Sequence, residues 1–236
     1  MCGRFARKST QEVLAEWLDL DLEEMPWFAP TYNAAPQSIQ PVVRLNRDSG
    51  SREIALLRWG LVPFWARDAR IGSSMINARA EEAAAKPAYR EALKKRRCLV
   101  PADAFYEWQR LDSRAKLPFA IAMKSGEPYA FAGLWESWRP RDGERLETFT
   151  ILTTDPNEVM EPIHNRMPVI LEPSSYDRWL DVGDPARPPI DLLRPYPAER
   201  MCAWPVSDRV GNVRNNEPSL LDPAIPGPTQ NQLPLN

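Results

Sequence analysis

Cys2 is the residue of this sequence with the most distinctive chemistry, because it directly follows the initiator methionine. Methionine is normally trimmed when the second residue is small, and trimming would leave a chain that begins with a 1,2-aminothiol. The α-amine of such a terminus has a reference pKa of about 7.7 to 8.0, so it adds to an aldehyde as an imine more readily than a lysine amine does. The neighbouring thiol can then close a five-membered thiazolidine ring. In an arbitrary Met-Cys sequence, however, an accidental Cys2 is the commoner case.

The number and spacing of the glycine, histidine and cysteine residues exclude several other kinds of site. The ten glycines never lie closer than seven residues apart, so neither a GxGxxG motif nor a P-loop can be written from them. His164 is the single histidine, and Cys2, Cys98 and Cys202 have no CxxC spacing, which excludes a zinc finger and an HExxH metalloenzyme. We therefore expect no metal and no cofactor. Cys98 and Cys202 lie in apolar, strand-like runs and are expected to be buried structural thiols.

Six short strings of uncommon composition follow one another in a fixed order. They are MCGRFA (Met1–Ala6), YNAAP (Tyr32–Pro36), WGLVP (Trp59–Pro63), INARAE (Ile76–Glu81), FYEW (Phe105–Trp108) and IHNRMP (Ile163–Pro168). Together they resemble the SOS response-associated peptidase (SRAP) family. The resemblance runs from Cys2 to the segments Pro205–Ser207 and Val210–Val213, which is nearly the whole chain.

The resemblance implies a fold, a partner and an activity. The fold would be a single α+β SRAP-like domain of twisted, largely antiparallel β-sheets with a few flanking helices, built around a positively charged DNA groove. The partner would be single-stranded DNA that contains abasic sites. The activity would be that of an abasic-site sensor, or shield, that forms a covalent thiazolidine DNA–protein cross-link through Cys2. Weak AP-lyase activity through the Schiff base and self-processing of the Met1–Cys2 bond would be side activities.

The family's catalytic residues correspond to Cys2, Asn77, Glu107 and His164, all present here with their flanking motifs. An abasic deoxyribose is mostly a closed hemiacetal, and its ring must open to offer an aldehyde. A carboxyl group such as Glu107 can shuttle that proton, and the neutral Asn77 can hydrogen-bond the sugar or orient the Cys2 amine. His164 can assist ring opening and the proton transfers of the imine. Taken singly, Asn77 could be a turn residue, Glu107 a surface carboxylate and His164 a lone histidine without a catalytic role. Only their joint occurrence with Cys2 favours the catalytic roles.

Six further positions resemble the family's DNA-binding residues. Three arginines each lie within two residues of a proposed catalytic residue, and guanidinium groups suit phosphate oxygens: Arg4, Arg79 and Arg166. Three others match positions of the DNA groove: Asn33, Trp65 and Thr153. Trp65 can stack on an exposed base, but with nine tryptophans in the chain core packing is an equal alternative.

Two other functions remain open on the sequence alone. A free Cys2 with Asn77 as a nearby oxyanion donor could attack an amide, as in an N-terminal-nucleophile amidohydrolase or peptidase. A non-covalent single-strand binder would instead keep its affinity after loss of the Cys2 thiol and amine. Incubation with abasic single-stranded DNA separates these hypotheses, because only the covalent cross-linking function predicts a heat-stable adduct.

Few helices are predicted to support these residues. Ser9–Glu24 is predicted as the first, because Ser9 and Glu12 have capping-box spacing and the apolar residues share one face. A second is predicted over Lys86–Arg97, whose final basic run suits a solvated helix end better than a DNA contact. A third is predicted to start at Asp155–Glu158, and a fourth to cover Tyr176–Leu180.

Short apolar segments rich in β-branched and aromatic residues predict eight strands. They are Pro41–Leu45, Glu53–Trp59, Cys98–Val100, Ala104–Trp108, Pro118–Met123, Tyr129–Trp135, Glu147–Thr153 and Val169–Leu171. Many short strands with few long helices are typical of a curved, largely antiparallel α+β domain.

Length and charge bound the remaining properties. The 236 residues are 43% hydrophobic with a net charge of −2, which excludes whole-chain disorder and a wholly basic nucleic-acid binder. Without repeats or a composition break, we expect one domain over 2–222 and a flexible, proline-rich tail over 223–236. The tail segment Gln230–Leu233 lacks the aromatic pair of a sliding-clamp motif. The absence of a leader and of a long apolar run favours a cytoplasmic monomer without membrane contact, associated with the nucleoid when bound to DNA.

Overall fold

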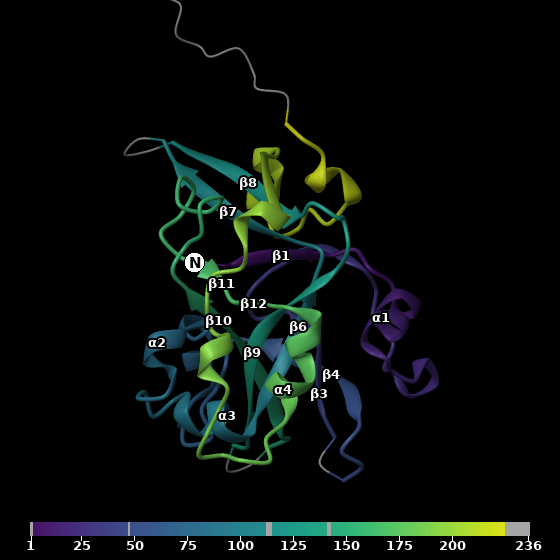
Figure 1. The fold of residues 1–236 in the computed structure, drawn as a ribbon, viewed down its shortest axis with the longest axis vertical. Helices are drawn as coiled ribbons and strands as arrows, with labels where there is room; N and C mark the ends of the chain where they lie inside the picture. Colours follow the sequence, from purple (N-terminus) through teal and green to yellow (C-terminus); the bar gives the residue numbers. More distant parts are fainter. Residues whose placement is uncertain (1, 47, 112–114, 141–142, 225–236) are drawn as a thin grey trace, which may run out of the picture.

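Two β-sheets form the centre of the molecule, and the helices lie at its periphery (Figure 1). The computed structural model describes residues 2–46, 48–111, 115–140 and 143–224. One sheet occupies the upper half of Figure 1, and the other, with the helices α2, α3 and α4, occupies the lower half. In this view the purple N-terminal strand crosses the molecule at the level where the two sheets meet.

The upper sheet has five strands in the order β13-β8-β7-β1-β2. Their bounds are Arg4–Arg7 (β1), Thr31–Ala34 (β2), Ala104–Arg110 (β7), Lys116–Met123 (β8) and Met201–Pro205 (β13). Every pairing in it is antiparallel. The β1 strand is flanked on both sides, so the residues that precede it are placed against β7, about a hundred positions further along the chain.

The lower sheet contains a small mixed barrel. Its strands are Ile39–Leu45 (β3), Arg52–Trp59 (β4), Asn77–Arg79 (β5), Arg97–Ala102 (β6), Tyr129–Trp138 (β9), Leu146–Thr154 (β10), Met167–Pro168 (β11) and Ile170–Leu171 (β12). The ring β10-β4-β3-β6-β9 closes because β9 also pairs with β10. The β4–β10 and β5–β10 pairings are parallel, and the others are antiparallel.

The helices are short. The α-helices are Gln11–Leu18 (α1), Ala80–Ala83 (α2), Arg90–Lys95 (α3) and Tyr176–Leu180 (α4). The 3-10 helices are Leu22–Glu24 (η1), Ala69–Ser74 (η2), Pro173–Ser175 (η3), Ile190–Leu192 (η4), Ala198–Arg200 (η5), Asp208–Gly211 (η6) and Pro218–Leu221 (η7). No helix in the described part of the chain has the length and apolar character needed to cross a bilayer.

The first predicted helix is shorter than expected, and its predicted cap is wrong. The helix α1 starts after Thr10 and ends at Leu18, because the following residue, Asp19, has a φ of 54° in the left-handed region. The Ser9 hydroxyl donates to Asp103 Oδ1 at 2.8 Å, and the Ser9 amide donates to the same carboxylate at 3.0 Å. Since the buried Asp103 carboxylate comes from the loop between β6 and β7, a tertiary contact replaces the local capping box.

Of the other three predicted helices, one is shorter than expected, one is absent and one is confirmed. The second helix is limited to α3, because Lys86–Tyr89 forms turns and Arg97 continues as the buried first residue of β6. Arg97 is therefore not part of a solvated helix end, and its guanidinium donates to the carbonyl of Trp179. The predicted third helix is wrong: residues 158–163 form successive turns instead. The fourth is confirmed as α4, without a side-chain cap at Ser175.

The α+β prediction with largely antiparallel sheets is confirmed, and all eight predicted strand segments coincide with strands or lie beside them. Cys98 is buried as expected, whereas Cys202 on β13 is only half-buried. Pro223 forms a bridge with Val206 and the Ala224 amide donates to Pro205, so the folded part continues two residues beyond the predicted boundary at 222. The rest of the predicted tail, 225–236 with its segment 230–233, lies outside the described residues.

Candidate functional site

Cys2 lies two residues before β1 and is completely buried. Its side chain belongs to the hydrophobic cluster that also contains Phe5 and Phe131. Burial raises the pKa of the Cys2 thiol, and the negative charge of Glu107 raises it further. The thiol is therefore protonated at neutral pH. Met1 lies outside the described residues.

Glu107 reaches Cys2 through the register of two antiparallel strands. Arg4 pairs with Tyr106 and Phe5 pairs with Phe105. The same register, continued by one residue, places Glu107 opposite Gly3, which directly follows Cys2. Glu107 is 3% exposed, which leaves its carboxyl group in a largely water-free position. A carboxyl group in such a place can exchange protons with a bound molecule without competition from solvent.

Asn77 is the first residue of β5 and contacts the main chain of Cys2. Its Nδ2 donates to the Cys2 carbonyl oxygen at 2.8 Å. Its Oδ1 is buried and accepts no hydrogen bond from the described residues. An acceptor in that state costs free energy unless a donor arrives, and an amine or a sugar hydroxyl would be such a donor.

The WGLVP string positions Asn77. The Trp59 indole N–H donates to the carbonyl of Ile76 at 2.9 Å, and the Leu61 amide donates to that of Met75 at 3.1 Å. Gly60 has a φ of 124°, and a Cβ atom there would collide with the Gly72 carbonyl. The close approach of these two loops therefore requires glycine, and it holds the chain that enters β5.

His164 lies half-buried between β10 and β11, in a loop that is tied to the strand of Glu107. The His164 amide donates to the Met160 carbonyl at 2.8 Å, which closes a helical turn. Gln109, on β7 with Glu107, donates through Nε2 to the Pro162 carbonyl at 2.9 Å. His164 Nδ1 accepts a hydrogen bond from the Arg166 amide at 3.0 Å.

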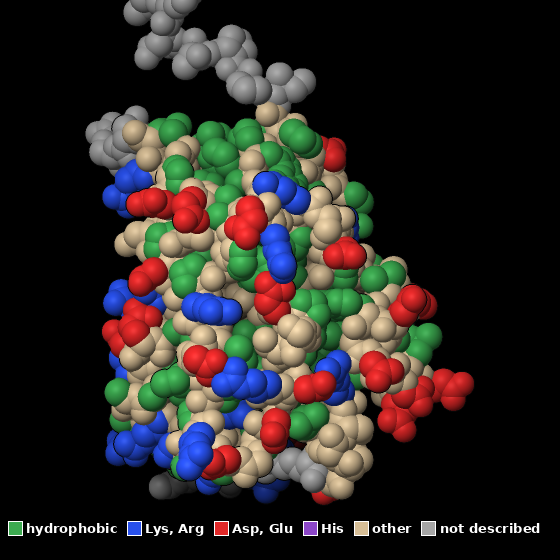
Figure 2. All heavy atoms as spheres, in the orientation of Figure 1, with side chains coloured by type: hydrophobic (Ala, Val, Ile, Leu, Met, Phe, Trp, Pro, Cys, Tyr) green, Lys and Arg blue, Asp and Glu red, His purple; other side chains and the backbone are tan. Residues whose placement is uncertain are grey.

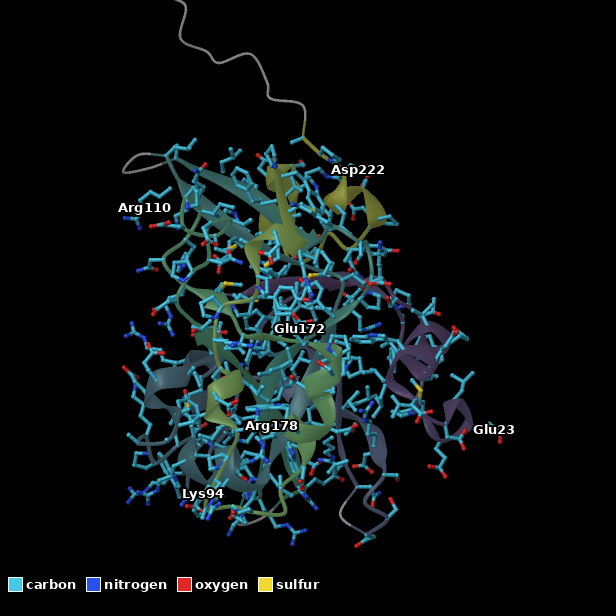
Figure 3. All side chains as sticks on the ribbon, viewed as in Figure 1. Glu23, Lys94, Arg110, Glu172, Arg178 and Asp222 are labelled. Carbon is cyan, nitrogen blue, oxygen red and sulfur yellow. The ribbon has the colours of Figure 1, made fainter. Side chains whose placement is uncertain are left out.

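These contacts bring the predicted catalytic residues to one region of the molecule. Cys2 contacts Asn77 and lies within electrostatic range of Glu107, and the His164 loop is hydrogen-bonded to the same strand as Glu107. In Figure 3 the end of this strand is marked by Arg110, at the upper left. No group of three or more His, Cys, Asp or Glu residues in the described ranges is arranged to hold a metal ion.

Arg79 is an accessible cation at this region. It lies two residues after Asn77 on β5, so both side chains leave the strand on the same side. Its side chain is 56% exposed, and its contact with Glu82 is long, at 3.7 Å. A loosely paired and exposed guanidinium group is free to exchange its partner for a phosphate.

Arg4 and Asn33 are occupied by the backbone of the C-terminal segment. Arg4 donates to Asn33 Oδ1 and to the Val210 carbonyl, both at 2.8 Å, and to that of Gly211 at 3.1 Å. Asn33 is buried, and its Nδ2 donates to carbonyls of the same segment. Burial lowers the pKa of the Arg4 guanidinium. In the described structure these two residues hold residues 210–215 in place.

Arg166 and Thr153 are buried, and Trp65 is not. Thr153 is 0% exposed, and its hydroxyl faces the Ala78 carbonyl. The Arg166 guanidinium donates to Glu81, to Asp155 and to the Thr153 carbonyl. Trp65 and its neighbour Phe64 are half exposed, which excludes core packing for Trp65 and leaves it accessible for stacking on a base.

The face shown in Figure 2 carries acidic and basic side chains interspersed, not a continuous basic surface. Acidic groups gather at its right edge, where Figure 3 labels Glu23 on η1. A continuous basic groove, which the family resemblance predicts, is not on this face.

Sequence reasoning missed three side chains that hold the site together. Glu81 and Asp155 bond Arg166, and Gln109 bonds the His164 loop. Glu81 ends the INARAE string, but a single carboxylate there has the pattern of an ordinary exposed helix residue. No local signal marks the other two, because their partners are distant in sequence.

Nearly the whole chain is similar to known proteins. The family model for the SOS response associated peptidase (SRAP) matches residues 1–213. The chain is 44% identical over 225 residues to the abasic site processing protein YoqW of Bacillus subtilis (strain 168), covering 94% of this chain and 99% of YoqW. It is 34% identical over 235 residues to the abasic site processing protein HMCES of Xenopus tropicalis, covering 87% of this chain and 68% of HMCES.

Solved structures with the same fold include two bacterial proteins. A protein from Bacteroides thetaiotaomicron has a TM-score of 0.82 at 26% identity, covering 95% of this chain and all of that one. A phage-related protein from Bordetella bronchiseptica has a TM-score of 0.68 at 32% identity, covering 88% of this chain and 95% of that one. The arrangement of sheets described above is therefore shared along nearly the whole length.

Proposed function

The chain belongs to the SOS response associated peptidase (SRAP) family, and from this premise we propose that it processes abasic sites in single-stranded DNA by linking itself covalently to them through Cys2. Two relatives bear the name abasic site processing protein, and the sequence correspondence extends over nearly the whole of this chain for one of them. The single structural observation that carries the proposal is the hydrogen bond from Asn77 Nδ2 to the Cys2 carbonyl, beside the buried Glu107.

The proposed reaction begins when removal of Met1 frees the Cys2 α-amine. The opened sugar offers an aldehyde, and the amine adds to its carbon to give a carbinolamine, which loses one water to form an imine. The Cys2 thiol then adds across the C=N bond: a C–S bond forms, and the thiol proton ends on the nitrogen. The product is a thiazolidine, and the only other product is that one water molecule. The sequence of steps balances without an oxidant or a reductant.

Each neighbouring residue has a role that its position supports. Asn77 holds the Cys2 carbonyl and so fixes the direction of the α-amine, while its unbonded Oδ1 can receive that amine or a sugar hydroxyl. Glu107 moves the proton that opens the sugar ring, because a buried carboxyl group is protected from exchange with solvent. Burial keeps the Cys2 thiol protonated, so its proton must leave during ring closure. Glu107 is close enough to the thiol to accept that proton and pass it to the nitrogen.

The N-terminal-nucleophile peptidase is the second candidate, since the family name includes that activity. In such an enzyme, Asn77 would donate to the carbonyl of the amide under attack. Its observed acceptor is instead the carbonyl of Cys2 itself, which lies on the far side of Cys2 from the Met1–Cys2 bond. This geometry favours an orienting role for Asn77 over that of an oxyanion donor.

The first prediction tests the proposed function directly. Mature protein incubated with single-stranded DNA that holds one abasic site is expected to give a slower band that survives heating in denaturant. The same oligonucleotide with an intact base is the matched control and is expected to give none. Amide hydrolysis without a heat-stable band would contradict the proposal and support the peptidase.

The second prediction concerns Arg79 as a phosphate contact. Replacing it by glutamine is expected to weaken binding about equally across DNA sequences, because phosphates carry no sequence information. The slope of log affinity against log salt is expected to flatten by about 0.7, the value for one lost single-strand contact. Measurement is by fluorescence anisotropy over a salt series.

Arg187→Gln is the control for Arg79→Gln. Arg187 is also an exposed arginine in a long ion pair three residues away, with Asp184 at 3.6 Å, but it belongs to the loop after α4. Its substitution is expected to leave the slope unchanged. If Arg79→Gln weakened binding to one base context only, Arg79 would contact a base rather than a phosphate.

A further inference from the structure

We propose that Asn157 is a positioning residue for His164: it holds the turn that carries the imidazole against the sheet that carries Glu107. The proposal rests on the proposed function in so far as His164 takes part in the cross-linking chemistry. Asn157 precedes His164 in the segment between β10 and β11, and it is only 7% exposed. It therefore acts through its protein contacts rather than on DNA.

The segment that carries His164 has little regular structure of its own. The described residues 155–166, between β10 and β11, form turns but no helix or strand. Pro162 has no amide hydrogen, so it cannot donate the bond that would continue a helix through the segment. Since so short a stretch of turns is not stable alone, contacts with the rest of the fold must hold it in one conformation.

The side chain of Asn157 is linked to His164 through Met160. Asn157 Oδ1 accepts a hydrogen bond from the Met160 amide at 3.1 Å, and the Met160 carbonyl accepts one from the His164 amide at 2.8 Å. Met160 is fully buried in the hydrophobic cluster that also contains Cys2. A single residue thus joins the two turns, so a displacement at Asn157 is passed on to His164.

The amide nitrogen of the same side chain ties the turn to the upper sheet. Nδ2 donates to the Tyr196 carbonyl at 2.7 Å and to Met201 Sδ at 3.2 Å. Met201 begins β13, which pairs with β8, and β8 pairs with β7. The second tie is the hydrogen bond from Gln109 of β7 to the Pro162 carbonyl. The turn is therefore held at two points to the sheet that carries Glu107.

Only part of this arrangement survives in each substitution at position 157. An asparagine side chain offers an acceptor and a donor, and both are used here. Aspartate keeps an acceptor for the Met160 amide but has no N–H for the Tyr196 carbonyl, and alanine has neither. A misplacement of about 1 Å at a reacting group can cost about 10²-fold in rate. Loss of both bonds is therefore expected to displace His164 and slow the reaction, although no group that contacts DNA is removed.

The first measurement uses the fact that this chain has one histidine, so protein labelled with ¹⁵N-histidine shows a single main-chain amide. Its order parameter is expected to be about 0.85 in the wild type, the value of a rigid backbone. In Asn157→Ala it is expected to fall below about 0.6, the range of a flexible one. Asn157→Asp, the conservative variant, is expected to give an intermediate value.

The second measurement separates the rate from DNA binding. At saturating abasic single-stranded DNA, Asn157→Ala is expected to cross-link about 10- to 10²-fold more slowly than the wild type, and Asn157→Asp is expected to recover part of that loss. Affinity for intact single strands is expected to be unchanged, because a residue that only positions His164 supplies no phosphate contact.

Asn46→Ala is the matched control. Asn46 also closes a turn, because its Oδ1 accepts from the amides of Asp48 and Ser49, and its Nδ2 also donates, to Glu53. It belongs to the connection between β3 and β4 and has no contact with the His164 turn. Its substitution is expected to leave the order parameter of the His164 amide and the cross-linking rate unchanged.

A wild-type order parameter or a wild-type rate in Asn157→Ala would overturn the proposal, as would weaker DNA binding that accounts for the whole loss of rate. If Asn157→Ala did not fold, the same measurements on Asn157→Asp would decide. The NMR measurement needs neither DNA nor cross-linking. If the wild-type protein formed no adduct, the proposed function would fail, while the order parameter would still decide whether Asn157 holds His164.

Discussion

Protein that keeps any residue before Cys2 is expected to form no heat-stable adduct with abasic single-stranded DNA. An amide nitrogen has no lone pair available for addition to an aldehyde, so a blocked chain cannot form the imine from which the cross-link is built. The expected effect is complete loss, larger than that of any substitution around the site. The measurement is the adduct yield at saturating DNA, with the N-terminus of each preparation established by its intact mass.

The matched control carries the same additional residue after Asn236 instead of before Cys2 and is expected to cross-link normally. Cys2→Ala, with Met1 removed, separates the amine from the thiol: borohydride should still trap its imine, but no unreduced adduct should survive heating. Equal cross-linking by the blocked and free proteins would remove the α-amine from the mechanism. A heat-stable, unreduced adduct with Cys2→Ala would remove the thiol.

Glu107→Gln is expected to slow cross-link formation by a substantial part of the ~10²–10⁴-fold range typical of a positioned proton-transfer group. Glutamine preserves the size and hydrogen-bonding capacity of the side chain, but it cannot shuttle a proton. Affinity for intact single strands is expected to be unchanged or slightly higher, because a negative charge is removed. The two measurements are the cross-linking rate at saturating abasic DNA and the equilibrium binding of intact DNA.

The sign of the charge effect on Cys2 sharpens this prediction. The Glu107 carboxylate helps to raise the pKa of the Cys2 thiol, so its removal lowers that pKa and favours the thiolate. A slower reaction in Glu107→Gln therefore cannot come from a less acidic thiol, and it points to proton transfer. A normal rate would exclude Glu107 from the mechanism. A slow rate that weak binding explains entirely would give Glu107 a structural role.

Local sequence was sufficient for eight of the thirteen strands in the described residues, for α4 and for the identities of the chemically capable residues; it missed β1, β2, β5, β11 and β13. The alternating apolar and β-branched segments are information held within a few residues, and the same is true of a cysteine that follows the initiator methionine. Helix boundaries were less predictable, because distant groups decide them: Asp103 takes the Ser9 hydroxyl that would have capped α1. Closure of the barrel depends on the pairing of β9 with β10 and on parallel contacts that no short pattern encodes.

The sequence by itself determined which groups could carry the chemistry, since Cys2, Asn77, Glu107 and His164 are recognisable from their motifs. Only the tertiary structure decided what each group contacts and which charges remain available. Arg79 and Arg166 look alike in the sequence, yet one is exposed and the other is held by Glu81 and Asp155. The physical reason is that an arginine's role depends on whether its charge is already compensated and desolvated, and the compensating carboxylates here come from elements that meet only when the chain folds.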